Sequence, residues 1–173
     1  MKSIRNIFLI GLMGAGKTAI GRALARIADK AFYDADHEIE ARTGVRIPII
    51  FDIEGEKGFR LREEAIIQSL VQRDNIVLAT GGGAILSENN RQALRKHGLV
   101  IYLYASLDDL WERTCYDKNR PLLQTENPQQ QLANLFAERD TLYHHVADIV
   151  IDTTGKHVQN IAHTLWQKLK TSA

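Results

Sequence analysis

Short apolar runs alternate with longer amphipathic segments along the whole chain. Several of the runs are apolar almost without interruption, which is typical of strands buried on both faces. This alternation predicts an α/β fold, a mainly parallel sheet covered by helices on both sides. The predicted strands are Asn6–Ile10, Ala31–Ala35, Asn75–Ala79, Leu99–Tyr104 and Asp148–Asp152. The predicted helices lie between them, near residues 17–29, 57–72, 88–97, 107–116, 129–145 and 157–169.

Two segments do not follow the alternation. Arg42–Gly58 is rich in glycine and is interrupted by Pro48, and Tyr116–Pro128 is polar, with prolines at positions 121 and 128. Long excursions in compact domains are often lids or binding loops, and a plain surface connection is the alternative. Because ligands of parallel sheets bind at the carboxyl ends of the strands, we look for function in the residues that follow each strand.

The composition indicates one ordinary globular domain. The 173 residues are 45% hydrophobic and 25% charged, enough for one substantial core. The net charge of +1 gives no basic face for nucleic acid and no lysine-rich stripe for a membrane surface, and no apolar run is long enough to span a bilayer. Cys115 is the only cysteine, which excludes an intramolecular disulfide and a cysteine zinc cluster. We therefore expect a cytoplasmic protein in which Cys115 packs on a helix.

The sequence GLMGAGKTAI, Gly11–Ile20, directly follows the first strand. With a lysine and an arginine ahead of it, the strand superficially fits a secretory signal, which needs an apolar core and then a small-residue cleavage site. Here glycines and Lys17 interrupt the apolar run, and Ile20, Leu24 and Ile27 continue it at helical spacing. A signal peptide has no use for such a helix, so the pattern favours a different function.

Gly11–Thr18 matches G-x-x-x-x-G-K-[ST] between a predicted strand and a predicted helix, the context of a phosphate-binding loop. A chance match in a chain of this length has a probability of roughly half a percent. Glycines let backbone N–H groups point inward at the phosphates. Lys17 can reach the outer phosphates, and the Thr18 hydroxyl can bind Mg²⁺. The alternative is a glycine-rich turn with an incidental lysine.

Two aspartates, Asp34 and Asp36, stand where the second strand ends. Chance supplies about 0.4 such pairs in this length, so their place next to the phosphate loop matters more than the pattern. If the strand continues through them, both side chains project in the same direction. One could then serve Mg²⁺ through water while the other accepts a hydrogen bond from an alcohol nucleophile. The alternative is that Asp36 caps the following helix.

An arginine and a triple glycine suggest an acceptor site. Arg60 opens a predicted helix, and Glu63 and Glu64 follow at the spacing that lets a carboxylate hold the guanidinium in place. A solvated helix face is the alternative. Gly81–Gly83 follows the third strand and permits a close backbone approach, which favours a ligand wall over a simple tight turn.

Two more arginines lie further along the chain. Arg120 lies in the polar loop, which Pro121 stiffens, and suggests an arginine supplied in cis to stabilise a transferring phosphoryl group. Arg139 lies on the helix after that loop. Arg60 and Arg139 could together clamp a carboxylate, because the planar guanidinium group matches its geometry.

Taken together, these motifs resemble those of the shikimate kinases in order and spacing. The resemblance extends from about Asn6 to Asp152, and the triple glycine and RPLL make it far more specific than the phosphate loop alone. The motifs are GLMGAGKTAIG, FYDADHEIE, GEKGFRLREE, LATGGGAI, NRPLL and ERDTLY.

The resemblance implies a single P-loop kinase domain over residues 1–173, of three-layer α/β/α type with a five-stranded parallel sheet. It implies an acceptor-binding region at about 34–64 and a mobile lid at about 114–127. The implied reaction transfers the γ-phosphoryl group of ATP to the 3-hydroxyl group of shikimate in chorismate and aromatic amino-acid biosynthesis, with Mg²⁺ as cofactor. We expect a monomer that binds ATP and shikimate, and neither nucleic acid nor a membrane.

The resemblance also implies roles for individual residues. The expected catalytic residues are Lys17, Asp36 and Arg120. The expected ATP-binding residues are Gly14, Ala15, Gly16, Lys17, Thr18, Ala19, Arg113 (against the adenine) and Arg120. Shikimate is expected to contact Asp36, Arg60, Gly81, Gly82, Gly83 and Arg139, and the metal ion Thr18 and Asp34.

Two positions depart from the family's pattern. Ala19 and Ala35 stand where these kinases often carry a hydroxyl side chain. Each loses one neutral hydrogen bond, worth on the order of 1 kcal/mol, so we expect altered affinity at most. Two alternatives for the function stay open. One is a kinase of the same fold for another anionic acceptor, such as gluconate or a nucleoside monophosphate, and the other is a nucleotide-binding switch that transfers nothing.

Overall fold

Five parallel strands form one sheet in the computed structural model, which describes residues 5–171. β1 and β3 are buried along their whole length, whereas the edge strands β2 and β5 are partly exposed. The five predicted strands are confirmed, and the central ones are apolar because helices cover both of their faces. Across the sheet the order is β2 (Ala31–Asp34), β3 (Ile76–Ala79), β1 (Ile7–Ile10), β4 (Leu99–Tyr104) and β5 (Ile149–Asp152).

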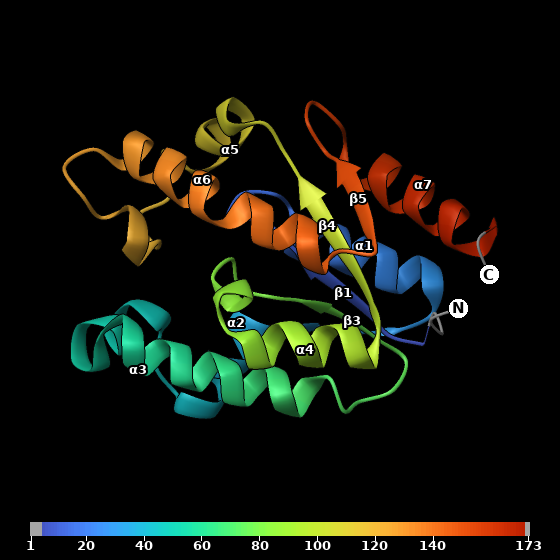
Figure 1. Ribbon diagram of the computed structural model, residues 1–173, viewed down its shortest axis with the longest axis horizontal. Helices are drawn as coiled ribbons and strands as arrows, with labels where there is room; N and C mark the ends of the chain where they lie inside the picture. Colours follow the sequence, from blue (N-terminus) through green and yellow to red (C-terminus); the bar gives the residue numbers. More distant parts are fainter. Residues whose placement is uncertain (1–4, 172–173) are drawn as a thin grey trace.

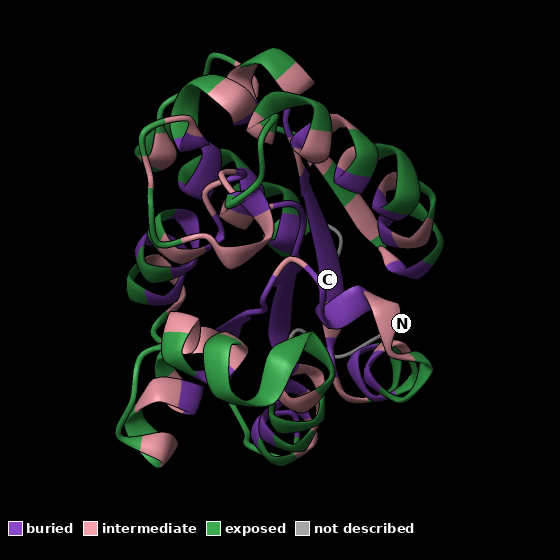
Figure 2. Ribbon diagram, turned by 90° about the vertical axis from the view of Figure 1, so that its left-hand side faces the viewer, coloured by how far each residue is buried: buried purple, intermediate pink, exposed green. Residues whose placement is uncertain are grey.

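Helices lie on both faces of this sheet (Figure 1), which confirms the three-layer architecture. α1 (Lys17–Ala28) and α7 (Val158–Thr171) pack against each other on one side, and α4 (Glu88–His97) and α6 (Pro128–Val146) pack on β4. Figure 2 shows the strands as a buried layer between the helices. No helix within residues 5–171 is long and apolar enough to cross a membrane. The remaining elements are α2 (Ala35–Thr43), α3 (Ile47–Leu70), α5 (Leu107–Thr114) and the 3₁₀ turns η1 (Ala84–Leu86) and η2 (Pro121–Leu123).

The residues of α1 explain how this helix is fixed behind the phosphate loop. Ile20 and Leu24 are buried, whereas Arg22 and Arg26 face solvent, as the helical spacing predicts. Gly21 lets α1 approach the edge of the sheet, because a Cβ atom there would lie 2.6 Å from the ring of Phe32. These contacts pack α1 closely on the sheet, directly after the loop that follows β1.

The segment 42–58 is mostly helical, so the prediction of an irregular excursion there is wrong. α2 runs to Thr43 and α3 begins at Ile47. Pro48 does not interrupt α3 because it lies in the first turn, where its missing N–H costs no helical hydrogen bond. Gly55, with φ of 70°, kinks the helix, and the predicted helix 57–72 is its second half. By contrast, the segment 116–128 holds no long helix or strand, as predicted.

β2 ends at Asp34, so Asp34 and Asp36 do not lie on one continuous strand as the sequence suggested. Asp34 Oδ1 accepts hydrogen bonds from the backbone N–H groups of Asp36 (3.0 Å) and His37 (3.2 Å). Asp34 is therefore the N-cap of α2, and Asp36 lies in the first turn of that helix. The alternative in which Asp36 is only a cap is wrong.

Candidate active site

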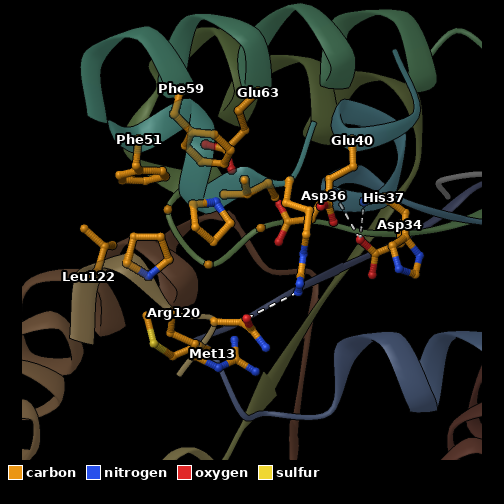
Figure 3. A pocket seen from close by; sticks show the side chains of 18 of the residues that line it. Met13, Asp34, Asp36, His37, Glu40, Phe51, Phe59, Glu63, Arg120 and Leu122 are labelled. Atoms are coloured by element: carbon orange, nitrogen blue, oxygen red, sulfur yellow. Dashed lines mark hydrogen bonds between the residues drawn. The ribbon is translucent and has the colours of Figure 1, made fainter. Parts of the chain in front are cut away.

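A cavity of about 390 Å³ opens at the carboxyl ends of β1, β2 and β3, the edge where we expected function. α3 contributes Phe51, Phe59 and Glu63 to one wall, and the loop around η2 contributes Arg120 and Leu122 to the other (Figure 3). The predicted site residues that line this cavity are Thr18, Asp34, Asp36, Arg60, Gly81, Gly82, Gly83, Arg120 and Arg139. The predicted site residues outside its lining are Gly14, Ala15, Gly16, Lys17, Ala19 and Arg113.

The loop between β1 and α1 has the backbone that its glycines predict. Gly14 and Gly16 have φ values of 82° and 92°, which L side chains rarely adopt. Lys17 Nζ donates hydrogen bonds to the carbonyl oxygens of Gly11 (2.6 Å) and Leu12 (2.9 Å), so the lysine folds back over the loop. Burial, followed by the charge of Arg120, lowers the pKa of Lys17 to about 8.

Thr18 and Asp34 meet at the start of α1. The Thr18 hydroxyl donates to Asp34 Oδ2 at 2.5 Å, while the other carboxylate oxygen of Asp34 caps α2. Within the described part of the chain, no group of three or more His, Cys, Asp or Glu side chains could hold a metal ion. Mg²⁺ usually keeps several waters and takes one or two carboxylates together with substrate phosphates. The Thr18–Asp34 pair fits that requirement.

Asp36 lines the cavity and carries one unpaired acceptor atom. Its Oδ1 atom is buried and has no hydrogen-bond partner. Burial, followed by the charges of Glu63 and Asp34, raises the pKa of Asp36 to about 7. A carboxylate of this kind can orient a hydroxyl group and take its proton near neutral pH.

Arg60 is held by carboxylates of its own helix. Its Nη1 atom lies 2.8 Å from Glu63 Oε1, and its Nη2 atom lies 3.2 Å from Glu56 Oε1. Burial raises the pKa of Glu63, whose side chain is 2% exposed. The predicted arginine–carboxylate pair is thus present with Glu63. Glu64 instead accepts hydrogen bonds from Ser87 Oγ and Asn89 Nδ2.

Arg139 is 2% exposed on α6, yet its Nε and Nη1 atoms have no hydrogen-bond partner. The three glycines make room for the charged groups around it. A Cβ atom at Gly81 would lie 2.5 Å from Glu63 Oε2, and one at Gly83 would overlap the guanidinium of Arg60. The triple glycine therefore lets the side chains of Glu63 and Arg60 lie close to the loop backbone.

Arg120 and Arg113 differ in their positions relative to the cavity. Arg120 pairs with Asp117 of its own loop, with Nε 3.0 Å from Oδ2, and lines the cavity. Arg113 lies outside the cavity and donates to the Gly14 carbonyl oxygen at 3.0 Å.

At the two departures from the family's pattern, Ala19 is exposed and Ala35 is completely buried.

Sequence reasoning missed the apolar part of the cavity. Phe51 and Phe59 face each other with ring centroids 4.8 Å apart, and Met13 and Leu122 add to the lining. Phe59 directly precedes Arg60 in a motif that was recognised, which could have indicated it. Phe51 lies in the segment for which no helix was predicted, so no periodicity pointed to it.

Comparisons with known proteins identify the family of this chain. A family model described as shikimate kinase matches residues 13–170. A shikimate kinase of Chromobacterium violaceum is 59% identical, over 96% of this chain and 91% of its own length. The solved shikimate kinase from Acinetobacter baumannii in complex with shikimate is 47% identical, with a TM-score of 0.96 over 99% of this chain and 96% of that one. A thymidylate kinase from Candida albicans, 16% identical with a TM-score of 0.58 over 97% of this chain and 92% of that one, shares the fold alone. The chain belongs to the shikimate kinase family.

Proposed function

We propose that this chain transfers the γ-phosphoryl group of ATP to the 3-hydroxyl group of shikimate, giving shikimate 3-phosphate and ADP in aromatic amino-acid biosynthesis. The observation that carries the proposal is the guanidinium group of Arg139, which is buried in the cavity with two nitrogen atoms unpaired. Burying such donors without partners is costly, so an anionic ligand placed there stabilises the site. The carboxylate of shikimate provides that anion.

The ATP site is proposed to be the loop after β1, with Arg113 against the adenine. Lys17 is already held across the loop by two carbonyl oxygens, and phosphate oxygens offer it charged, stronger acceptors. The contact of Arg113 with the carbonyl oxygen of Gly14 supports its place next to the nucleotide. The proposed phosphate-binding residues are Gly14, Ala15, Gly16, Lys17, Thr18 and Ala19.

Mg²⁺ is proposed to bind at Thr18 and Asp34. The support is the 2.5 Å contact between the Thr18 hydroxyl and the Asp34 carboxylate at the edge of the cavity. When bound together with ATP, the ion neutralises charge on the phosphate oxygens. The two residues hold oxygen atoms in place for it.

Asp36 is proposed to accept a hydrogen bond from the 3-hydroxyl group of shikimate. The hydroxyl oxygen forms a bond to the γ-phosphorus while the bond from that phosphorus to the bridging oxygen of ADP breaks. The hydroxyl proton passes to the Asp36 carboxylate, and ADP leaves with the bonding electron pair. Lys17 and Arg120 stabilise the charge on the phosphate oxygens, and Arg60, Arg139 and Gly81–Gly83 hold the acceptor.

Residues 114–127 are proposed to form a lid over an acceptor-binding region at 34–64, within one domain of residues 1–173. Arg46 Nη2 donates to Asn119 Oδ1 at 3.3 Å, a contact between the two regions that supports closure. A closed lid excludes water and limits wasteful hydrolysis of ATP. We also propose that the chain acts as a cytoplasmic monomer. Its net charge of +1 supports the proposal that it binds neither nucleic acid nor a membrane.

Replacing either arginine of the acceptor site is expected to weaken shikimate binding selectively. For Arg139→Leu we expect KM for shikimate to rise about 10-fold to 100-fold, because a charge-assisted contact to the carboxylate is lost, while KM for ATP stays unchanged. Steady-state kinetics with each substrate varied in turn checks this.

Arg60→Leu serves as the contrasting variant. It should raise KM for shikimate as well, but it also leaves the buried carboxylate of Glu63 without its partner. We therefore expect it to lower the free energy of unfolding by about 3–5 kcal/mol, more than Arg139→Leu does. Equal rises in KM for ATP and for shikimate in both variants would refute the carboxylate clamp.

A further inference from the structure

Tyr143 carries a buried hydroxyl group that the proposed reaction does not use. The residue lies on α6 one turn after Arg139, and it is 1% exposed. Its hydroxyl donates a hydrogen bond to the carbonyl oxygen of Gly82, which is 61 residues away in the sequence. Burial raises the pKa of Tyr143 above its usual range, so the hydroxyl keeps the proton that it donates. The bond ties α6 to the glycine loop, Gly81–Gly83.

Gly82 lies between the phosphate loop and the acceptor site. A Cβ atom built on Gly82 would lie 3.4 Å from the backbone nitrogen of Met13 and 3.7 Å from Nη1 of Arg139. This one peptide therefore lies close to both the phosphate loop and Arg139. The hydroxyl of Tyr143 holds the carbonyl oxygen of Gly82 in place through this hydrogen bond.

The neighbours of Gly82 contact the other charged side chains of the cavity. Gly81 lies against Glu63, and Gly83 lies against the guanidinium of Arg60. Because a Cβ atom would not fit at either position, a small displacement of the glycine loop displaces Arg60 or its partner. Arg139, in contrast, moves with α6. The glycine loop thus lies against Arg60 of α3 and is fastened to α6, which carries Arg139.

We propose that Tyr143 is a positioning residue for phosphoryl transfer: its hydroxyl fastens the glycine loop to α6 and thereby sets the spacing of Arg60 and Arg139. The proposal rests on the proposed acceptor site, because that site gives the spacing its function. Reacting groups must be held within a fraction of an ångström for efficient transfer, so a loop that is free to shift reduces productive binding of the acceptor.

A matched control lies in the same ring stack. Tyr102 stacks on Tyr143 with ring centroids 4.8 Å apart, and it is also 1% exposed. Its hydroxyl donates to Asp140 Oδ1 at 2.8 Å and does not reach the glycine loop. Tyr102→Phe and Tyr143→Phe each remove one hydroxyl from the same stack, but only Tyr143→Phe releases Gly82, and it also removes the contact of that hydroxyl with Arg139, so the exchange of the loop amides is the readout specific to the loop.

The experiment compares these two variants with the parent protein in steady-state kinetics and in hydrogen exchange. For Tyr143→Phe we expect KM for shikimate to rise about fivefold to tenfold, the equivalent of one buried hydrogen bond, with KM for ATP unchanged. The amides of Ala84 and Leu86, which donate to the Gly81 and Gly83 carbonyl oxygens at 3.1 Å, should exchange faster. Tyr102→Phe should leave KM and both amides as in the parent. Equal KM values in the parent and Tyr143→Phe, or an equal rise in both variants, overturns the proposal.

A third variant covers the case in which Tyr143→Phe does not fold. 4-Aminophenylalanine at position 143 keeps the ring and an N–H donor at the same place, so its KM for shikimate should stay within about threefold of the parent. A larger rise in that variant, comparable to that expected of Tyr143→Phe, shows that the donor is not what matters and overturns the proposal. The exchange measurement needs no substrate. It therefore tests the loop anchor even if the parent shows no shikimate-dependent ADP release, a result that would instead contradict the proposed function.

Discussion

Asp36→Asn is expected to lower kcat by about 10²-fold to 10⁴-fold, the usual contribution of a positioned general base. Asparagine keeps the size of the side chain but cannot take the proton of the acceptor hydroxyl. ATP binding should be largely retained, because Asp36 makes no hydrogen bond to the phosphate loop and is proposed to contact the acceptor. Kinetics of ADP release, together with nucleotide binding measured by calorimetry, checks both parts.

The pH dependence provides a second test of Asp36. Only the ionised carboxylate accepts the proton, and the pKa of Asp36 is raised to about 7. In the parent, kcat/KM for shikimate should therefore fall tenfold per pH unit as the pH drops below about 7. This acidic limb should disappear from the residual activity of Asp36→Asn. Asp52→Asn, an exposed aspartate on α3, serves as the control and should behave as the parent. Turnover retained in Asp36→Asn would remove this residue from the mechanism.

Arg120→Ala is expected to slow turnover by roughly 10²-fold or more, by analogy with arginines supplied to other phosphoryl transfers. Arg120 lies in the proposed lid and lines the cavity, and its ion pair with Asp117 holds it in the same loop. Since its charge is needed most in the transition state, kcat should fall more than KM for either substrate changes. Single-turnover measurements of ADP formation separate this effect from product release.

The matched control for Arg120 is Lys118, an exposed cation two residues earlier in the same loop. Lys118→Ala removes the same net charge from the lid without touching the cavity lining, so its kcat should stay within about twofold of the parent. If Arg120→Ala turned over as fast as Lys118→Ala, Arg120 would have no role in the transfer.

Local sequence patterns were enough to predict most of the fold and the phosphate loop. Buried strands read as apolar runs, and the G-x-x-x-x-G-K-[ST] pattern requires a backbone that glycine alone adopts easily, so both predictions held. The pairing of Arg60 with Glu63 follows from helical spacing, which is also local. The error in 42–58 arose because proline and glycine were read as interruptions, although Pro48 lies in the first turn of α3. The error at Asp34 arose because the strand was continued through an aspartate that in fact caps the next helix.

The remaining features depend on contacts between distant parts of the chain. The unpaired nitrogen atoms of Arg139 are visible only once α6 lies against the glycine loop. The raised pKa of Asp36 depends on burial and then on the charge of Glu63, 27 positions further along the sequence. The bond from Tyr143 to Gly82 spans 61 positions. No pattern within a single segment encodes such relations, because they arise from the packing of the sheet and its helices.

The measurement that tests the central claim most directly is ADP release from Mg²⁺-ATP with and without shikimate, coupled to identification of the phosphorylated product. We predict that ADP release depends strongly on shikimate and that shikimate 3-phosphate forms in equal amount. Gluconate and a nucleoside monophosphate, tested as acceptors in parallel, should give no comparable turnover. ATP binding without any response to shikimate would contradict the proposed reaction. Transfer to one of the other acceptors would then indicate a kinase of different specificity, and transfer to none would indicate a nucleotide-binding switch.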